Sequence, residues 1–362
     1  FMLATALLSM WISNTATAVM MLPIGMAVVT HLAGDSAQKA QIGKILMLAI
    51  AYAASIGGVA TLIGTPTNLV LAGVIEELYG KEISFTEWFV FGLPISIVLL
   101  TICWIYLTRV AGKLGVSSIP GGRAEIRRQL HALGKLTYEE RIVGIVFAAT
   151  ALCWILRSFV LNQWLPGLND TIIAIAGASI LFFLPSRQKS QMLLDWEAAV
   201  RIPWGIILLF GGGLALAAGF QTTGLAEWIG SQLTLLEGVH LVILILVLIA
   251  AVNFLTEITS NVATASMILP ILASLALAIN VHPYGLMVAA TVAASCAFML
   301  PVATPPNAVV FGSGYLRIPD MVRTGIWMNL ISIVLLTLAV YLLLPEIWQI
   351  DLHAPLQEGM SN

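Results

Sequence analysis

The sequence SNTATAVMMLPI, from Ser13 to Ile24, returns as SNVATASMILPI from Ser260 to Ile271. Nine of the twelve positions are identical at a constant offset of 247 residues. Each copy places a polar Ser-Asn pair in the middle of an apolar run. Irregular backbone at membrane depth is tolerated only where it lines a cavity or is buried in protein. The repeated pair therefore predicts two related halves, each interrupted at a site of special purpose.

The composition is that of an integral membrane protein. The 362 residues are 59% hydrophobic and 9% charged, whereas soluble domains are about 25% charged. Successive apolar runs approach the length of a membrane-spanning helix. Cys103, Cys153 and Cys296 each stand alone in an apolar run, without metal or disulfide spacing, which is typical of small buried hydrophobic residues.

The first apolar runs predict a hairpin and then a broken helix. Residues 3–12 and 16–30 are short for a bilayer core of about 30 Å, so we expect a re-entrant hairpin with Ser13-Asn14-Thr15 at its tip. The expected continuation is a polar loop, an interrupted helix and an ordinary span, at residues 31–44, 45–78 (break at 63–68) and 89–108.

The end of the chain repeats this order. The second half is expected to hold a leading leg, a return leg, a broken helix and a last span, at residues 239–253, 262–278, 284–315 (break at 303–307) and 325–344. Three further spans precede its hairpin, at 142–159, 171–184 and 206–220. No such spans precede the first hairpin. If the repeat is complete, roughly 110 residues come before Phe1 in the intact protein.

The basic residues predict the orientation in the membrane. Residues 109–141 form the longest polar segment, which we interpret as a cytoplasmic linker with a surface helix at 124–133 and not as a nucleic-acid-binding patch. With this linker inside, all of the 16 basic residues except Lys81 and Arg157 fall on the cytoplasmic side. Five crossings then separate the hairpins. Because five is odd, the hairpins enter from opposite faces and the repeats are inverted.

Each of the four breaks carries residues that start helices. Ser-Asn pairs are N-cap residues ahead of the two return legs, and Thr-Pro pairs supply an N-cap and a first-turn proline in the broken helices. Four helix N-termini are therefore expected near mid-membrane, with unpaired N–H groups and positive dipole ends. This is an anion site built without a buried Arg or Lys.

The same breaks offer oxygen atoms to cations. Unwound carbonyls, amides and hydroxyls suit a hard monovalent cation such as Na⁺. Ser9 precedes Ser13 by about one helical turn, as Thr256 precedes Ser260. Two pseudo-symmetric sites are expected, one from Ser9, Ser13, Asn14 and Gly64, the other from Thr256, Thr259, Asn261 and Ala303.

Simpler interpretations exist for each feature alone. A single Ser-Asn pair in an apolar run is more often a helix-packing hydrogen bond, and a single Thr-Pro is usually a kink. Four such breaks at repeated spacing favour the binding interpretation. Glu257 is the one acid inside a hairpin, and an intramembrane carboxylate is a functional candidate. It is either a gating or proton-linked group or a residue near the outer vestibule.

At these residues the sequence resembles the divalent anion:sodium symporter (INDY-type) family of dicarboxylate and citrate transporters. The Ser-Asn-Thr tips and the Gly/Ala-Thr-Pro-x-Asn breaks carry the resemblance, which covers the whole chain without the family's first spans. The resemblance implies a homodimeric elevator in the cell membrane, in bacteria the inner membrane. It implies an extracellular tail at 345–362, a scaffold at 142–238, and a transport domain formed by 1–108 and 239–344.

The resemblance also implies the substrate contacts, namely Asn14, Thr15, Thr65, Pro66, Asn261, Thr304 and Pro305. One position departs from the family's pattern, because Val262 replaces the threonine of the second Ser-Asn-Thr. One hydroxyl contact is thereby lost, which leaves the substrate preference open.

We therefore predict a secondary transporter that carries succinate, malate or fumarate inward with two or more Na⁺ ions. Within transport, the alternatives are a dicarboxylate exchanger and a citrate or sulfate carrier. A channel or a proton/cation antiporter is a different class, and the cavity lacks the paired carboxylates that an antiporter needs. An intramembrane enzyme is the weakest candidate, because no catalytic or metal-binding constellation lies at membrane depth.

Overall fold

The computed structural model describes residues 1–30, 36–112, 122–187, 191–202, 204–225, 228 and 238–355. Across these ranges the chain is helical, and its β-structure is one isolated antiparallel bridge between Pro185 and Met192. The predicted all-α class is confirmed. Parts of the expected loop, linker, scaffold and tail lie outside the described residues, at 31–35, 113–121, 188–190, 203, 226–227, 229–237 and 356–362.

The first half contains two short helices, a broken helix and a long helix. These are α1 (Met2–Ser9), α2 (Asn14–Thr30), α3 (Ser36–Val59), α4 (Pro66–Tyr79) and α5 (Phe85–Ile105), which continues as the π-helical turn η1 (Tyr106–Ala111). The second half has the same order, in α13 (Leu241–Leu255), α14 (Asn261–Ala278), α15 (Pro283–Ala294), α16 (Pro305–Phe311) and α17 (Ile318–Trp348).

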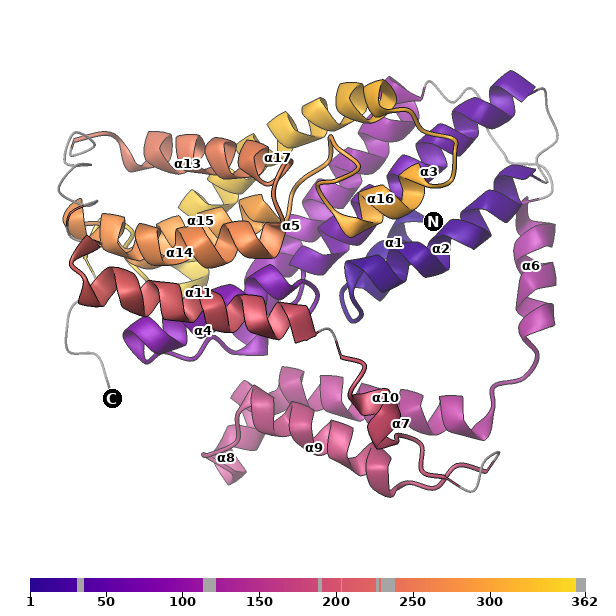
Figure 1. Ribbon diagram of the computed structural model, residues 1–362, viewed down its shortest axis with the longest axis horizontal. Coiled ribbons are helices and arrows are strands. Elements are labelled where there is room, and N and C mark those ends of the chain that lie inside the picture. Colours follow the sequence, from indigo (N-terminus) through magenta and orange to yellow (C-terminus); the bar gives the residue numbers. More distant parts are fainter. Residues whose placement is uncertain are drawn as a thin grey trace.

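The two halves interlock. Helix α16 packs against α2 and α3, while α14 packs against α4. In Figure 1, α13 and α14 approach the middle of the molecule from one end, and α1 and α2 approach it from the other. The return legs therefore begin near the centre of the bundle, which is the region that the repeated sequence motif marks.

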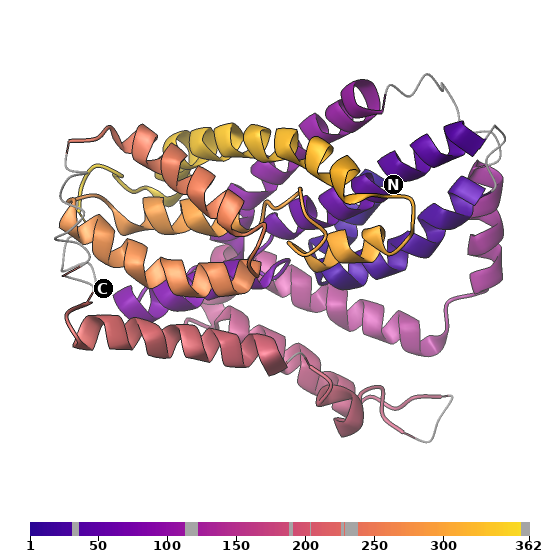
Figure 2. The ribbon, with the colours of Figure 1, turned by 45° about the horizontal axis from the view of Figure 1, so that its top comes forward.

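A separate group of helices lies between the halves in sequence. It comprises α6 (Gly122–Leu133), α7 (Tyr138–Leu156), η2 (Arg157–Leu161), α8 (Asn162–Trp164), α9 (Asp170–Phe183), α10 (Trp196–Ala199) and α11 (Trp204–Thr222). Helices α7 and α9 pack on each other and lie to one side of the bundle in Figure 1. Helix α11 runs along α14, as the turned view in Figure 2 also shows.

Within the described ranges, five helices are long and apolar enough to cross a membrane by length and composition, at Ser36–Val59, Phe85–Ala111, Tyr138–Trp164, Asn261–Ala278 and Ile318–Trp348. Shorter apolar helices include α2 and α13. The middle of the bundle is the most buried part, and Tyr52, Trp88 and Phe298 are fully enclosed there. A multi-pass membrane protein is the architecture that these helices describe.

Two boundaries differ from the sequence expectation. Helix α3 begins at Ser36, so most of the expected polar loop is helical. Its first turns contain Ala, Gln and Lys, which are strong helix formers that need no apolar environment. Both broken helices also stop earlier than expected, at Val59 and Ala294. Proline marks where the second segments start, but no local residue type marks where the first segments end.

Both breaks are closed by an asparagine from the helix that follows. The Nδ2 of Asn68 donates to the carbonyl of Thr61 at 2.8 Å and to that of Gly58 at 3.4 Å. The Nδ2 of Asn307 donates to the carbonyls of Leu300 at 3.0 Å and Ala297 at 3.2 Å. The Asn of each Thr-Pro-x-Asn motif thus satisfies the carbonyls that the unwound helix leaves free.

Candidate functional site

The tip of the first hairpin gathers oxygen atoms around Asn14. The hydroxyl of Ser9 lies 2.6 Å from Oδ1 of Asn14 and 2.7 Å from the carbonyl oxygen of Ala54. Helix α1 supplies Ser9, and α3 supplies Ala54. Ser9 is completely buried, so the cluster is closed to solvent on the α1 side.

The amide of Asn14 fits this cluster in two orientations. With its nitrogen turned inward, the amide donates to Ser9 Oγ, Ala54 O and Gly64 O at 2.6, 3.0 and 3.3 Å. With its oxygen turned inward, four oxygens converge. That second arrangement is favourable when a cation lies among them, because hydroxyl, amide and carbonyl oxygens are ligands that Na⁺ accepts. The donor set therefore fits Na⁺ as a transported ion.

The second hairpin repeats the arrangement. The hydroxyl of Thr256 donates to Asn261 Oδ1 at 2.7 Å and lies 3.1 Å from the carbonyl oxygen of Ala294. Thr256 is completely buried, as is its counterpart Ser9. The carbonyls of Ala54 and Ala294 both come from the last turns of the helix that precedes a break. Sequence reasoning did not identify these two oxygens, since a backbone carbonyl has no residue-type signature.

The remaining predicted cation ligands lie close by but have other contacts. Ser13 is exposed, and its hydroxyl accepts from the N–H of Ala16 at 3.2 Å. The hydroxyl of Thr259 donates to Leu255 O at 2.9 Å and lies 2.6 Å from Thr264 Oγ1. Ala303 is buried in the second break. Among the described contacts, none joins these three residues to the Ser9 or Thr256 cluster.

The predicted substrate residues of the hairpins lie at the starts of α2 and α14. Thr15 is exposed in the first turn of α2, and Val262 is half-buried in the first turn of α14. The hydroxyl that distinguishes Thr15 from Val262 is thus on an accessible surface. Ser260 is the N-cap of α14, but its side chain makes no capping hydrogen bond.

The Thr-Pro pairs start α4 and α16 as predicted. Pro66 and Pro305 occupy first-turn positions, and Pro305 is exposed. Thr304 caps α16 by accepting from the N–H of Asn307 at 3.3 Å. Thr65 makes no such capping bond, which leaves the first N–H groups of α4 without a side-chain cap.

Two hydroxyls that the sequence did not single out connect the halves. Thr67 Oγ1, in the first turn of α4, lies 2.7 Å from Ser295 Oγ at the end of α15 and 3.3 Å from Thr65 Oγ1. All three side chains are buried. The first break therefore contacts the second directly. The sequence signal that could have indicated this contact is a Ser or Thr next to a predicted break, because polar residues are rare in this chain.

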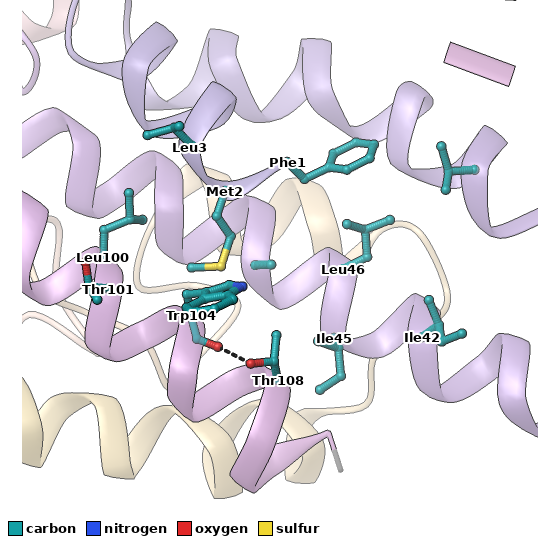
Figure 3. A pocket seen from close by; sticks show the side chains of 12 residues that line it. Phe1, Met2, Leu3, Ile42, Ile45, Leu46, Leu100, Thr101, Trp104 and Thr108 are labelled. Atoms are coloured by element: carbon teal, nitrogen blue, oxygen red, sulfur yellow. Dashed lines mark hydrogen bonds between the residues drawn. The ribbon is translucent and has the colours of Figure 1, made fainter. Parts of the chain in front are cut away.

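Two cavities lie near these elements. One of about 650 Å³ extends from Pro66 in the first turn of α4 to Trp154 and Asp170 in the α7–α9 group. The other, of about 590 Å³, is shown in Figure 3 and lies between α1, α3 and α5. Apart from Thr101 and Thr108 its lining is apolar, and the Thr108 hydroxyl is occupied by the carbonyl of Trp104 at 2.6 Å. Only the first cavity borders a predicted substrate residue.

A partly buried ion cluster borders the cavity at Pro66 through Glu82 and Asp170. Arg157, whose side chain is 6% exposed, lies 2.7 Å from Glu82 and 3.1 Å from Asp170. Oδ2 of Asp170 accepts from the N–H of Phe85 at 2.7 Å. The ring of Phe85 stacks on Trp154 of α7. The α7–α9 group is therefore held to the first half by charge and by aromatic contact at one place.

The all-helical bundle, its two matching broken helices and its paired oxygen clusters define a polytopic membrane transporter. Residues 1–348 match the model of the sodium:sulfate symporter transmembrane region. The chain belongs to this family, whose members it resembles over almost its whole length. The relatives that the chain matches are transporters and not enzymes, which agrees with the sequence prediction.

Two relatives show how close the similarity is. The chain is 48% identical to the sodium-dependent dicarboxylate transporter SdcS of Staphylococcus saprophyticus, over 98% of this chain and 70% of the relative. It is 46% identical to SdcS of Staphylococcus aureus with the same coverage. Among solved structures, MtrF of Neisseria gonorrhoeae, described as an antimetabolite efflux pump, matches with a TM-score of 0.55 at 14% identity, over 94% of this chain and 77% of that one. This last likeness concerns the fold alone.

Proposed function

We propose that the protein carries C4-dicarboxylates such as succinate, malate or fumarate across the cell membrane together with Na⁺. The observation that carries the proposal is the matched pair of oxygen clusters at Asn14 and Asn261. The relatives at 46–48% identity are named sodium-dependent dicarboxylate transporters. A carboxylate substrate suits a site formed by helix N-termini, where N–H groups and dipoles favour negative charge.

The coupling has a physical basis in this arrangement. A dicarboxylate brings two negative charges into a site whose described breaks contain no Lys or Arg. Two cations at the hairpin tips offset this charge and favour substrate binding. Each cation also fixes the Asn that begins a return leg, so it orders the N–H groups that the substrate needs. We therefore infer at least two Na⁺ ions per substrate.

We further propose that the two hairpins are re-entrant and that the protein works as a homodimeric elevator. Residues 1–108 and 239–344 are the moving transport domain, and residues 142–238 belong to the scaffold. The separation of α7 and α9 from the bundle supports this division. The contact at Arg157 then lies on the boundary between the two domains.

The test is uptake of radiolabelled succinate into proteoliposomes that contain the intact protein. We expect accumulation with an inward Na⁺ gradient and little with K⁺, whereas uptake that ignores cation gradients refutes symport. Asn14→Ala and Asn261→Ala should each abolish uptake, while Gln163→Ala, an exposed amide in η2–α8 far from both clusters, serves as the control. Normal uptake by both Asn variants contradicts the site.

Two alternatives are decided by the same preparation. Because the family description names sulfate, and because Val262 lacks the hydroxyl of Thr15, excess unlabelled sulfate and citrate are tested as competitors. Exchange is recognised by uptake that requires dicarboxylate inside the liposomes. Competition by sulfate at concentrations below those of succinate would move the substrate assignment to sulfate.

A further inference from the structure

Glu257 is a buried acid that neither the cation clusters nor the substrate motifs use. It follows α13 directly, next to Thr256, and is 3% exposed. Its Oε1 accepts from the N–H groups of Phe298 at 2.7 Å and Met299 at 2.9 Å, and its Oε2 accepts from that of Leu300 at 3.0 Å. The amide Nδ2 of Asn329, on α17, donates to Oε1 at 2.7 Å. The carboxylate is therefore enclosed by protein groups and does not face open solvent.

The backbone N–H groups that bind Glu257 all belong to the unwound segment between α15 and α16. The peptide groups of this unwound segment lack the hydrogen-bond partners that a helix would give them, and unpaired backbone groups are costly when buried. Three successive N–H groups of the segment donate to the Glu257 carboxylate instead. On the carbonyl side, Phe298 O accepts from the Tyr52 hydroxyl at 2.8 Å and Cys296 O accepts from Asn253 Nδ2 at 2.5 Å. Glu257 is therefore the acceptor that keeps this segment in its unwound form.

Among its described residues, the first half has no such pair of a buried carboxylate and an amide. Gly92 of α5 and Gly325 of α17 lie against the carbonyls of Val59 and Phe298 respectively, so these two helices correspond. Four residues beyond each glycine stand Ser96 and Asn329. Ser96 donates to the carbonyl of Ile56 at 2.6 Å and does not face a carboxylate.

Met10 occupies the position that corresponds to Glu257, at the offset of 247. Its backbone carbonyl accepts from the hydroxyl of Thr61 at 2.5 Å. The first break also spans only residues 60–65, whereas the second spans residues 295–304. The Glu257–Asn329 pair is thus specific to the longer break.

We propose that Glu257 and Asn329 are positioning residues for the second cation site. The inference rests on the proposed Na⁺ coupling and adds to it which groups set the affinity of one site. The unwound segment begins directly after Ala294, whose carbonyl belongs to that site. Thr256 contacts Ala294 O, and the next residue, Glu257, holds Phe298, so consecutive residues fix both parts of the segment. A shift of the segment moves the carbonyl away from Thr256 and Asn261.

The experiment measures the Na⁺ dependence of succinate uptake by the intact protein. Glu257→Gln keeps the shape of the side chain but turns an –NH₂ group toward N–H donors. Groups that orient metal ligands typically change metal affinity by about 10–100-fold when they are mutated. We expect the Na⁺ concentration for half-maximal uptake to rise by about this factor, with the KM for succinate at saturating Na⁺ nearly unchanged. Met10→Leu and Ser96→Ala, at the corresponding positions of the first half, are the matched controls and should leave Na⁺ dependence unchanged.

A second variant and a second measurement keep the inference testable if Glu257→Gln does not fold. Asn329→Ser copies the first half and leaves the carboxylate on its three N–H groups, so a smaller rise in the same direction is expected. Na⁺ should also raise the thermal unfolding midpoint of purified Asn329→Ser less than that of the parent protein, because stabilisation by a ligand depends on its affinity.

A lower maximal rate with unchanged Na⁺ dependence in both variants indicates a merely structural role and overturns the inference. A parent protein whose uptake ignores Na⁺ refutes the proposed coupling instead, so the two failures are distinguishable.

Discussion

Asn307→Ala should destabilise the protein through the second break. The side chain is fully buried, and its Nδ2 donates to Leu300 O at 3.0 Å and to Ala297 O at 3.2 Å. Truncation leaves the buried carbonyl of Ala297 and the partly buried carbonyl of Leu300 without these donors, at about 1–3 kcal/mol each. Its Oδ1 accepts no hydrogen bond among the described residues, so losing that oxygen offsets part of the cost. We expect a net loss of about 2–4 kcal/mol in the free energy of unfolding.

The assay is thermal unfolding of the purified protein, followed by tryptophan fluorescence. Asn307→Asp is the sharper variant, because it keeps the volume and replaces the donor by a carboxyl oxygen that faces two carbonyls. It should lower the midpoint at least as far as alanine does. Asn68→Ala tests the corresponding amide of the first break. Midpoints equal to that of the parent protein for both Asn307 variants would refute the idea that this amide holds the break.

Three further predictions concern other parts of the molecule. Burial, with a smaller effect from Lys81, lowers the pKa of His282 to about 4 against an opposing effect of Asp351. The unfolded chain therefore binds a proton between about pH 6.5 and pH 4 that the folded chain does not, so stability should fall with decreasing pH in this window by at most about 1.4 kcal/mol per pH unit. Unfolding midpoints at pH 7.5 and 5 should show this fall in the parent protein and less of it in His282→Gln. Arg157→Met should cost about 1–3 kcal/mol by leaving the partly buried Asp170 without its partner. The Arg157→Met/Asp170→Asn double variant should recover part of that loss in the same unfolding assay. Gly57→Ala should destabilise the first hairpin, because a Cβ there overlaps the backbone of Ala6, whereas Gly144→Ala, at a position with open space, should not.

The sequence predicted where four helices of the candidate site begin, because particular residue types mark helix starts. The repeated Ser-Asn pairs do begin the return legs, and the Thr-Pro pairs do begin α4 and α16. These signals are local, since a proline in a first turn and a polar cap act within a few residues. The all-helical class and the family followed from the same motifs.

Other features depend on contacts between residues far apart in the chain, which no local pattern reports. The carbonyls of Ala54 and Ala294 join the oxygen clusters through Ser9 and Thr256, which lie 45 and 38 residues away in the sequence. Likewise, the sequence marked Glu257 as exceptional but not its partners, since Phe298 and Asn329 lie 41 and 72 residues away.

The two halves stabilise the same motif in different ways. In the first half, Gly57 and Gly58 let α3 approach α1 and the Asn14 amide so closely that a Cβ at either position overlaps them. The corresponding residues of the second half, Cys296 and Ala297, carry side chains and lie within the longer break.

In the second half the break is held instead by a carboxylate that accepts four hydrogen bonds. Close packing tolerates no added methyl group, whereas a carboxylate bound to N–H groups tolerates no loss of its accepting oxygens. The first cation site should therefore be sensitive to substitutions that add volume and the second to substitutions that remove charge. If Na⁺ binds both sites, variants of the two kinds should raise the Na⁺ requirement independently, and their effects should combine in a Gly58→Ala/Glu257→Gln double variant.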